Sequence, residues 1–206
     1  MVIVHHRVNT LEQLHQVAPE CGVEIDIRDY DGDLRLTHEP FATGDRLDDF
    51  LEAYRHSLLI LNTKCDGLER RILDCVERRA IRNFFFLDTA LPTLVRLSAA
   101  GVRQFAVRYS EFEPLPFVSK FAGLVDWVWI DCFRRPLAQI GVYDCLRRQF
   151  RTCLVSPELE GHPASAISLY RDALRHAEPD AVCTDFPATW SALADSIRCG
   201  REPVTA

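Results

Sequence analysis

Two acidic residues, Glu24 and Asp26, stand one residue apart in the otherwise apolar stretch 22–27. Alternation of this kind is typical of a β-strand, in which successive side chains point to opposite faces. Both carboxylates therefore share one face, roughly 6.6 Å apart along the backbone, while the apolar residues between them share the other. Because two carboxylates at this spacing can grip one divalent cation, we expect a metal site rather than the solvated face of an edge strand.

Polar side chains also close several other predicted strands. Asn62 and Lys64 share a face of the third strand, and four further strands end in Asp88, Arg108, Asp131 and Asp185. Catalytic residues of parallel barrels collect where strands end and loops begin, so this ring suggests a site. The three aspartates could equally be N-caps of the following helices, since Asp often accepts backbone N–H bonds there.

Histidines complete the set of reactive types, because an imidazole titrates near neutrality and can give or take a proton. His6 ends the first predicted strand and His38 follows a predicted hairpin. His5 points to the opposite face from His6, and only the adjacency of Arg7 favours His6. His38 alone could be a hydrogen-bonded surface histidine, and Lys64 could be a snorkelling residue at a helix cap.

The elements that must position these residues alternate between strand and helix patterns. Eight short apolar runs predict strands over 2–6, 22–28, 58–64, 83–88, 104–109, 126–131, 152–156 and 181–185. Between them, apolar residues three and four apart predict helices over 10–19, 47–55, 68–79, 93–100, 137–149, 164–176 and 190–198. Asp31-Gly32 is a turn signal, and the alternation over 34–38 predicts a hairpin that extends the second strand.

This alternation predicts an α/β fold, a compact (β/α)8 TIM barrel with a short β-hairpin after strand 2. An open doubly wound sheet is the alternative, but it usually carries a glycine-rich phosphate turn after its first strand, and the sequence has none there. We expect one barrel domain over 1–206, with a frayed tail over 200–206.

Composition narrows the classes of function. The chain has 206 residues, of which 48% are hydrophobic and 26% charged, so it can bury a substantial core. The net charge is −6 with basic residues scattered among acidic ones, which argues against nucleic acid as a partner. The sequence contains neither about 18 consecutive apolar residues nor the start of a secretory signal. We therefore expect no transmembrane segment and a cytoplasmic protein. The eight cysteines form no Cys-x-x-Cys pair, which argues against a zinc knuckle. The oligomeric state stays open.

Several motifs resemble, in their order, those of the glycerophosphodiester phosphodiesterases. The matching segments are His6-Arg7, Asn9-Thr10-Leu11, Glu24-Ile25-Asp26-Ile27, His38-Glu39-Pro40, Leu61-Asn62-Thr63-Lys64 and Thr184-Asp185-Phe186-Pro187. They stand where that family has His-Arg-Gly, Glu-Asn-Thr, Glu-x-Asp, His-Asp, Glu-x-Lys and Thr-Asp-x-Pro. The similarity is specific over the first 64 residues and is limited to the strand rhythm between 66 and 180.

The resemblance implies a Mg²⁺ or Ca²⁺ ion and two histidines that act as general acid and base. Carried over by position, the metal ligands are Glu24 and Asp26, with Asn62 at the place of the third acid. His6 and His38 become the catalytic pair. Arg7 and Lys64 become the contacts to the substrate phosphate.

Departures from the family pattern concern the metal and the first loop. Asn62 supplies an oxygen without charge, so metal affinity should be weaker unless another acid compensates. Glu158, after the seventh strand, and Asp131 are the candidates for that role. Val8 stands at the family's glycine and the acid before Asn9 is missing, so we expect a differently shaped first loop.

Three functions follow from this set of residues. The leading hypothesis is a metal-dependent phosphodiesterase that hydrolyses a small glycerol- or sugar-linked phosphodiester. A non-catalytic barrel that binds a phosphorylated metabolite or a protein partner is the second, motivated by Asn62. Intramolecular transfer that gives a cyclic phosphate is the third, because a neighbouring substrate hydroxyl can replace water.

Overall fold

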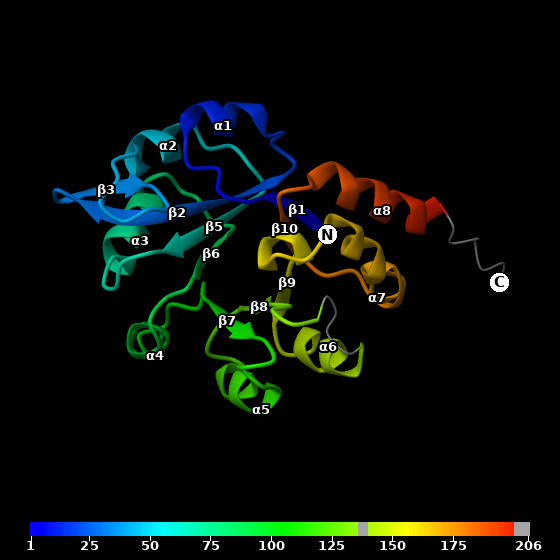
Figure 1. Cartoon of the computed structure of the whole chain (residues 1–206). Coiled ribbons are helices and arrows are strands. Elements are labelled where there is room, and N and C mark those ends of the chain that lie inside the picture. The colour runs from blue at the N-terminus through cyan, green and yellow to red at the C-terminus, as the bar shows by residue number, and fades with distance from the viewer. Residues whose placement is uncertain (136–139, 200–206) are drawn as a thin grey trace.

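The computed structural model describes residues 1–135 and 140–199, and its centre is a ring of eight parallel strands (Figure 1). These are β1 (Val2–His5), β2 (Gly22–Tyr30), β5 (Leu58–Thr63), β6 (Phe84–Leu87), β7 (Ala106–Tyr109), β8 (Trp127–Ile130), β9 (Arg151–Val155) and β10 (Ala181–Thr184). Each strand pairs with the next around the ring, and β10 pairs with β1. Between β6 and β7 the link is one parallel bridge, Phe86 opposite Phe105.

Gly22 shows why the ring is tight at its start. It pairs with Val4 on one side and with Leu58 on the other. A Cβ at Gly22 would lie 2.9 Å from the Leu58 carbonyl oxygen and 2.9 Å from Cγ2 of Val4. Only glycine therefore lets β1 and β5 approach β2 this closely.

Helices follow the strands and lie outside the ring (Figure 1). They are α1 (Leu11–Gln16), α2 (Leu47–Ala53), α3 (Glu69–Arg78), α4 (Leu91–Ala99), α5 (Leu115–Val118), α6 (Ile140–Arg147), α7 (Arg171–His176) and α8 (Pro187–Cys199). Short 3₁₀ helices add η1 (Ser119–Phe121), η2 (Pro157–Glu160) and η3 (Ala164–Tyr170). In the described ranges, no helix has both the length and the hydropathy to cross a membrane.

The predicted hairpin is present and extends beyond the ring. β2 continues to Tyr30 and pairs antiparallel with β3 (Asp33–Leu36), which pairs with β4 (Asp45–Arg46). The turn between β2 and β3 uses Asp31 and Gly32, both with positive φ, as the Asp-Gly signal predicts. The chain returns from β3 toward the mouth, where Thr37 donates its N–H to the Asp26 carbonyl oxygen.

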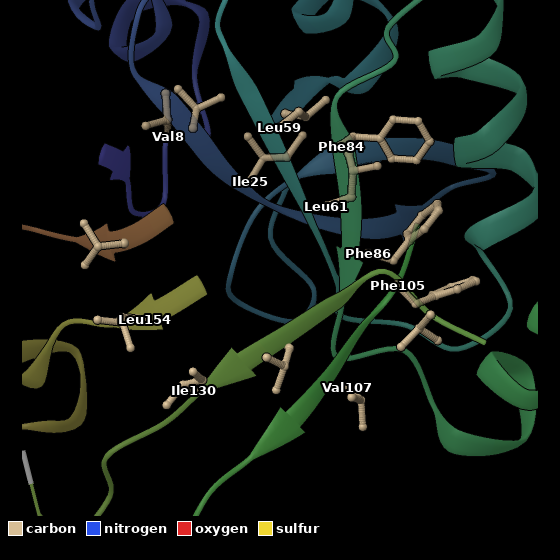
Figure 2. Packing of buried hydrophobic residues seen from close by; sticks show 14 of the residues in the cluster. Val8, Ile25, Leu59, Leu61, Phe84, Phe86, Phe105, Val107, Ile130 and Leu154 are labelled. Carbon is tan, nitrogen blue, oxygen red and sulfur yellow. The ribbon is translucent and has the colours of Figure 1, made fainter. Parts of the chain in front are cut away.

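Side-chain parity divides the core in two. Outward-facing residues pack under the helices, as Figure 2 shows for Ile25, Leu61, Phe86 and Phe105. The Phe86 and Phe105 rings stack at 5.3 Å over the β6–β7 seam. A second cluster fills the ring itself: Val4, Leu58, Ile60, Phe85, Leu87, Ala106, Trp127, Trp129, Cys153, Val155, Ala181 and Cys183. The ring is therefore packed rather than hollow, and its functional face is its C-terminal mouth.

The fold class is confirmed, and the eight predicted strands agree with the observed ones to within about two residues at most ends. Three details were wrong. The predicted helix 164–176 is a 3₁₀ segment followed by α7, helix 10–19 ends at Gln16, and α5 was not predicted. Residues 137–139 of the predicted helix 137–149 and the tail 200–206 lie outside the described residues.

Candidate functional site

Glu24 and Asp26 lie on the inner face of β2, as their parity predicts, and both are buried at the mouth. Glu24 is 1% exposed and Asp26 is 0% exposed. In the parallel register Asp26 is the direct partner of Asn62 on β5. The interpretation as the solvated face of an edge strand is therefore wrong, because β2 is paired on both sides and the acids are enclosed.

Each oxygen of the Glu24 carboxylate accepts one hydrogen bond. The backbone N–H of Arg7 donates to Oε2 at 2.8 Å, and Nδ2 of Asn62 donates to Oε1 at 2.8 Å. Burial raises the pKa of Glu24, and the charge of Asp26 adds to the rise, against a smaller lowering by His6 and the two donors. A cation at this carboxylate would compete with a proton.

Asp26 is held between an amide and an ammonium group. Nδ2 of Asn9 donates to Oδ2 at 2.8 Å, and the Asn9 side-chain oxygen accepts the Asp26 backbone N–H at 2.8 Å. Lys64 Nζ lies 3.2 Å from Oδ1. Asn9 belongs to the motif Asn9-Thr10-Leu11, to which the sequence assigned no role. Because the Lys64 ammonium lies beside Asp26, Lys64 is not a snorkelling residue at a helix cap.

Arg7 joins the acids to His38. Its φ of 53° is left-handed, an unfavourable conformation for a residue with a Cβ, and such strain clusters at functional sites. In this conformation its N–H meets Glu24, while its guanidinium lies 2.8 Å from Nε2 of His38 and its Nε 4.0 Å from Oδ2 of Asp26.

Both candidate histidines present Nδ1 to a carboxylate. His6 Nδ1 lies 3.0 Å from Oδ1 of Asp185, and His38 Nδ1 lies 2.8 Å from Oε1 of Glu39. A carboxylate accepts, so each ring donates through Nδ1 and keeps Nε2 for another partner. His5 faces the other way on β1 and is directly opposite Val23 of the outward face, so the mouth receives His6.

A third residue of β2, Arg28, fixes the loops that carry His38 and Lys64. Arg28 donates through Nε and through one terminal nitrogen to the His38 carbonyl oxygen, at 3.1 and 2.9 Å. Its other terminal nitrogen donates to the Lys64 carbonyl oxygen at 3.2 Å. The long extension of β2 thereby positions two candidate site residues from separate loops.

The two candidate compensating acids make other contacts. Glu158 accepts from the hydroxyls of Ser156 and Thr184 and from the backbone N–H of Asp185. It thus supports the carboxylate that binds His6. Asp131 pairs with Arg108, which also pairs with Asp88.

This pairing also answers the capping question for the strand-end aspartates. Asp88 and Asp131 bind Arg108, and Asp185 binds His6. The N-cap of α4, the helix after Asp88, is Ala90 without a side-chain hydrogen bond. The strand-end acids therefore form ion pairs across the mouth.

The oxygens present fit a hard divalent cation. Oδ1 of Asn62 is buried and has no hydrogen-bond partner among the described residues, although an amide oxygen is a strong acceptor. Oδ1 of Asp26 is also buried without a hydrogen bond, and the Lys64 ammonium lies 3.2 Å away as its counter-charge. Together with Glu24, Asp26 and Asn62 offer the oxygen ligands that Mg²⁺ and Ca²⁺ prefer. Within 1–135 and 140–199, no three His, Cys, Asp or Glu side chains are grouped so that they could hold a metal ion; the third candidate ligand, Asn62, is an amide.

A hollow of about 890 Å³ lies at the opposite end of the ring, where Arg55, Arg79 and Asn83 line it. Its arginines bind helix ends: Arg55 donates to the carbonyl oxygens of Glu52 and Tyr54, and Arg79 to that of Cys75. Cations at helix C-termini are a structural feature. The candidate site is therefore the mouth, where the acids and histidines meet.

Comparison with solved structures places this geometry in a known fold. A glycerophosphodiester phosphodiesterase from Agrobacterium tumefaciens aligns with a TM-score of 0.67 and 18% identity, over 97% of this chain and 100% of that one. A glycerophosphoryl diester phosphodiesterase from Parabacteroides distasonis aligns with a TM-score of 0.65 and 14% identity, over 100% of this chain and 88% of that one. No family model matches the sequence, and no curated protein matches it significantly. The chain therefore has the barrel fold of the glycerophosphodiester phosphodiesterases.

Proposed function

We propose that this chain is a metal-dependent phosphodiesterase that hydrolyses a small glycerol- or sugar-linked phosphodiester, with His6 and His38 as the general acid–base pair. One observation carries the proposal: Arg7 contacts Glu24, Asp26 and His38 at once. The acid pair and the histidine thus meet at one point of the mouth. The fold shared with two phosphodiesterases supports the same activity.

Glu24, Asp26 and Asn62 would hold the cation. When bound, Mg²⁺ or Ca²⁺ supplies charge neutralisation at the phosphoryl oxygens. Arg7 and Lys64 supply the remaining positive charge, since both lie beside Asp26 and can turn toward a phosphate. Charge spread over phosphoryl oxygens in the transition state is stabilised by such fixed cations.

The histidines would move the protons. Because Asp185 and Glu39 engage Nδ1 of each ring, Nε2 is the nitrogen that would exchange protons with the substrate. In His38 this requires Arg7, whose guanidinium lies 2.8 Å from Nε2, to turn away toward the phosphate. One Nε2 takes the proton of the attacking water, and the other returns a proton to the leaving alkoxide oxygen. Each transfer contributes roughly 10²–10⁴-fold to the rate.

Hydrolysis is tested with purified protein, bis(p-nitrophenyl) phosphate and glycerophosphodiesters, each with added Mg²⁺, Ca²⁺ or Mn²⁺. The proposal predicts metal-dependent release of phosphomonoester, lost in His6→Asn and His38→Asn. Absence of cleavage with every metal overturns it. Phosphorus NMR of the product separates hydrolysis from transfer, because transfer gives a cyclic phosphate. Thermal stabilisation by a phosphorylated ligand without turnover would indicate a binding protein.

A further inference from the structure

The segments after β6, β7 and β8 add exposed apolar side chains to the mouth, beside the ion-paired Asp88, Arg108 and Asp131. Four large hydrophobic side chains are exposed there: Leu91 48%, Val95 50%, Phe112 61% and Phe133 36%. We call these four residues the apolar rim. Leu91 and Val95 are one turn apart on the outer face of α4, whose buried residues are Thr93, Leu94, Leu97 and Ser98.

The aromatic part of the rim is held in place. The Phe112 and Phe133 rings lie 6.0 Å apart, on the loops after β7 and β8. Oε1 of Glu111 accepts the backbone N–H groups of Arg134 and Arg135, at 3.0 and 3.1 Å, and so ties the two loops together. Exposed apolar side chains grouped in this way mark a binding surface.

A crevice opens beside the rim between β6 and β7. Its volume is about 260 Å³, and the apolar side chains of Leu91, Leu94, Val107 and Phe117 line it. The only strand bridge that joins β6 to β7 within the described residues, Phe86 to Phe105, precedes the C-terminal ends of both strands. Strand pairing therefore does not close the seam above that bridge, next to the mouth.

Charged side chains connect the crevice to the acid pair. Asp88 and Arg108, which pair with each other, line the crevice. Oδ2 of Asp88 lies 3.8 Å from Nζ of Lys64, which lies 3.2 Å from Oδ1 of Asp26. A phosphate held by Lys64 would thus have one ester substituent at the entrance of an apolar crevice.

We infer that one ester substituent of the substrate is a single hydrocarbon chain, which lies in the crevice and over the apolar rim. This inference rests on the proposed phosphodiesterase function and narrows its substrate class to single-chain amphipathic phosphodiesters. One chain fits rather than two, because 260 Å³ holds roughly eight groups of the size of a water molecule, at about 30 Å³ each, and a methylene is of similar size.

The test compares glycerophosphodiesters that carry a methyl, butyl or octyl ester, below their micelle concentrations and with Mg²⁺. Full burial of each methylene favours binding about fourfold, so kcat/KM should rise at least tenfold from methyl to octyl. Leu91→Ser and Phe112→Ser should each reduce the octyl advantage without changing the methyl rate. Leu169→Ser is the matched control, because Leu169 is equally exposed, at 57%, on the β9–β10 connection.

Binding of octyl phosphate against methyl phosphate, measured by calorimetry, separates the two claims. Cleavage of the methyl ester with no octyl preference overturns the inference and leaves the phosphodiesterase function standing. Suppose that no ester is cleaved, that octyl phosphate binds at least tenfold tighter than methyl phosphate, and that Leu91→Ser removes this difference. The proposed hydrolysis is then wrong, and the proposed binding site for a hydrocarbon chain stands. Equal binding of both phosphates without cleavage overturns both.

Discussion

The backbone N–H of Arg7 donates a hydrogen bond to the buried carboxylate of Glu24, with 2.8 Å between N and Oε2. The bond requires the left-handed turn at Arg7, φ 53°, which carries the chain from β1 across the mouth. The same turn sends the guanidinium to His38. Arg7 therefore contributes its backbone to the position of one acid and its side chain to one histidine.

The substitution Arg7→Gly separates the contribution of the Arg7 backbone from that of its side chain. Glycine adopts positive φ without a Cβ penalty and keeps the N–H bond to Glu24, so the free energy of unfolding should change by less than about 1 kcal/mol. Loss of the guanidinium should lower kcat/KM by about 10–1000-fold. Thermal unfolding and diester kinetics check both. Asp31→Gly, at another left-handed position in the exposed β2–β3 turn, should leave kinetics unchanged; an Arg7→Gly protein of wild-type activity would contradict the assignment.

Asn62→Asp should tighten metal binding. The change adds a third carboxylate beside Glu24 and Asp26 at nearly constant shape, and Ca²⁺ affinity follows ligand charge. We expect at least a tenfold lower Kd for Mn²⁺ or Mg²⁺ by calorimetry. Without metal, the added buried charge should lower the free energy of unfolding by about 1–3 kcal/mol. Asn83→Asp at the opposite end is the control, and equal Kd values in wild type and Asn62→Asp would count against a cation between these strands.

Asp185→Asn tests the support of His6. The amide can present its NH2 group to Nδ1 and so fix the wrong tautomer of His6, and it carries no charge to stabilise the protonated ring. Supporting groups of this kind contribute about 10–100-fold, and the loss should appear in kcat with little change in KM. Asp172→Asn, a control on the exposed side of α7, should have no effect. A loss confined to KM would show that Asp185 acts on binding instead.

Asp131 should make stability depend on pH. Burial raises its pKa to about 7, against the lowering by Arg108. Between the unfolded value of 3.8 and about 7 the folded state therefore binds more protons, and the free energy of unfolding falls as pH rises. The Asp131→Asn protein lacks this contribution, so its free energy of unfolding should fall less as pH rises. Urea unfolding of both proteins at pH 4.5, 6 and 7.5 measures the difference, and parallel curves would refute it.

The parity of one strand is local information, which is why Glu24 and Asp26 could be placed on one face from the sequence. The choice of His6 over His5 follows from the same parity once β1 has a known register. The partner of His6 could not be found in this way, because Asp185 is 179 residues away and only the closure of β10 on β1 brings it near.

The sequence did not predict the shortest helices or the charge pairs between residues that are distant along the chain. α5 has four residues and a proline, too few to show a helical period. From the sequence, Asp88 and Asp131 could equally be helix caps, because Asp favours that position, or site residues. Their partner, Arg108 on the strand between them, was not identified. Such pairing depends on strand order around the ring, which no local pattern contains.

A crystal structure of protein soaked in Mn²⁺, with anomalous difference density, tests the central claim most directly. The account predicts one strong peak in contact with oxygens of Glu24, Asp26 and Asn62, with His6 and His38 on the open side of the ion. A site with no peak at these oxygens, in crystals that bind Mn²⁺ elsewhere, would contradict it.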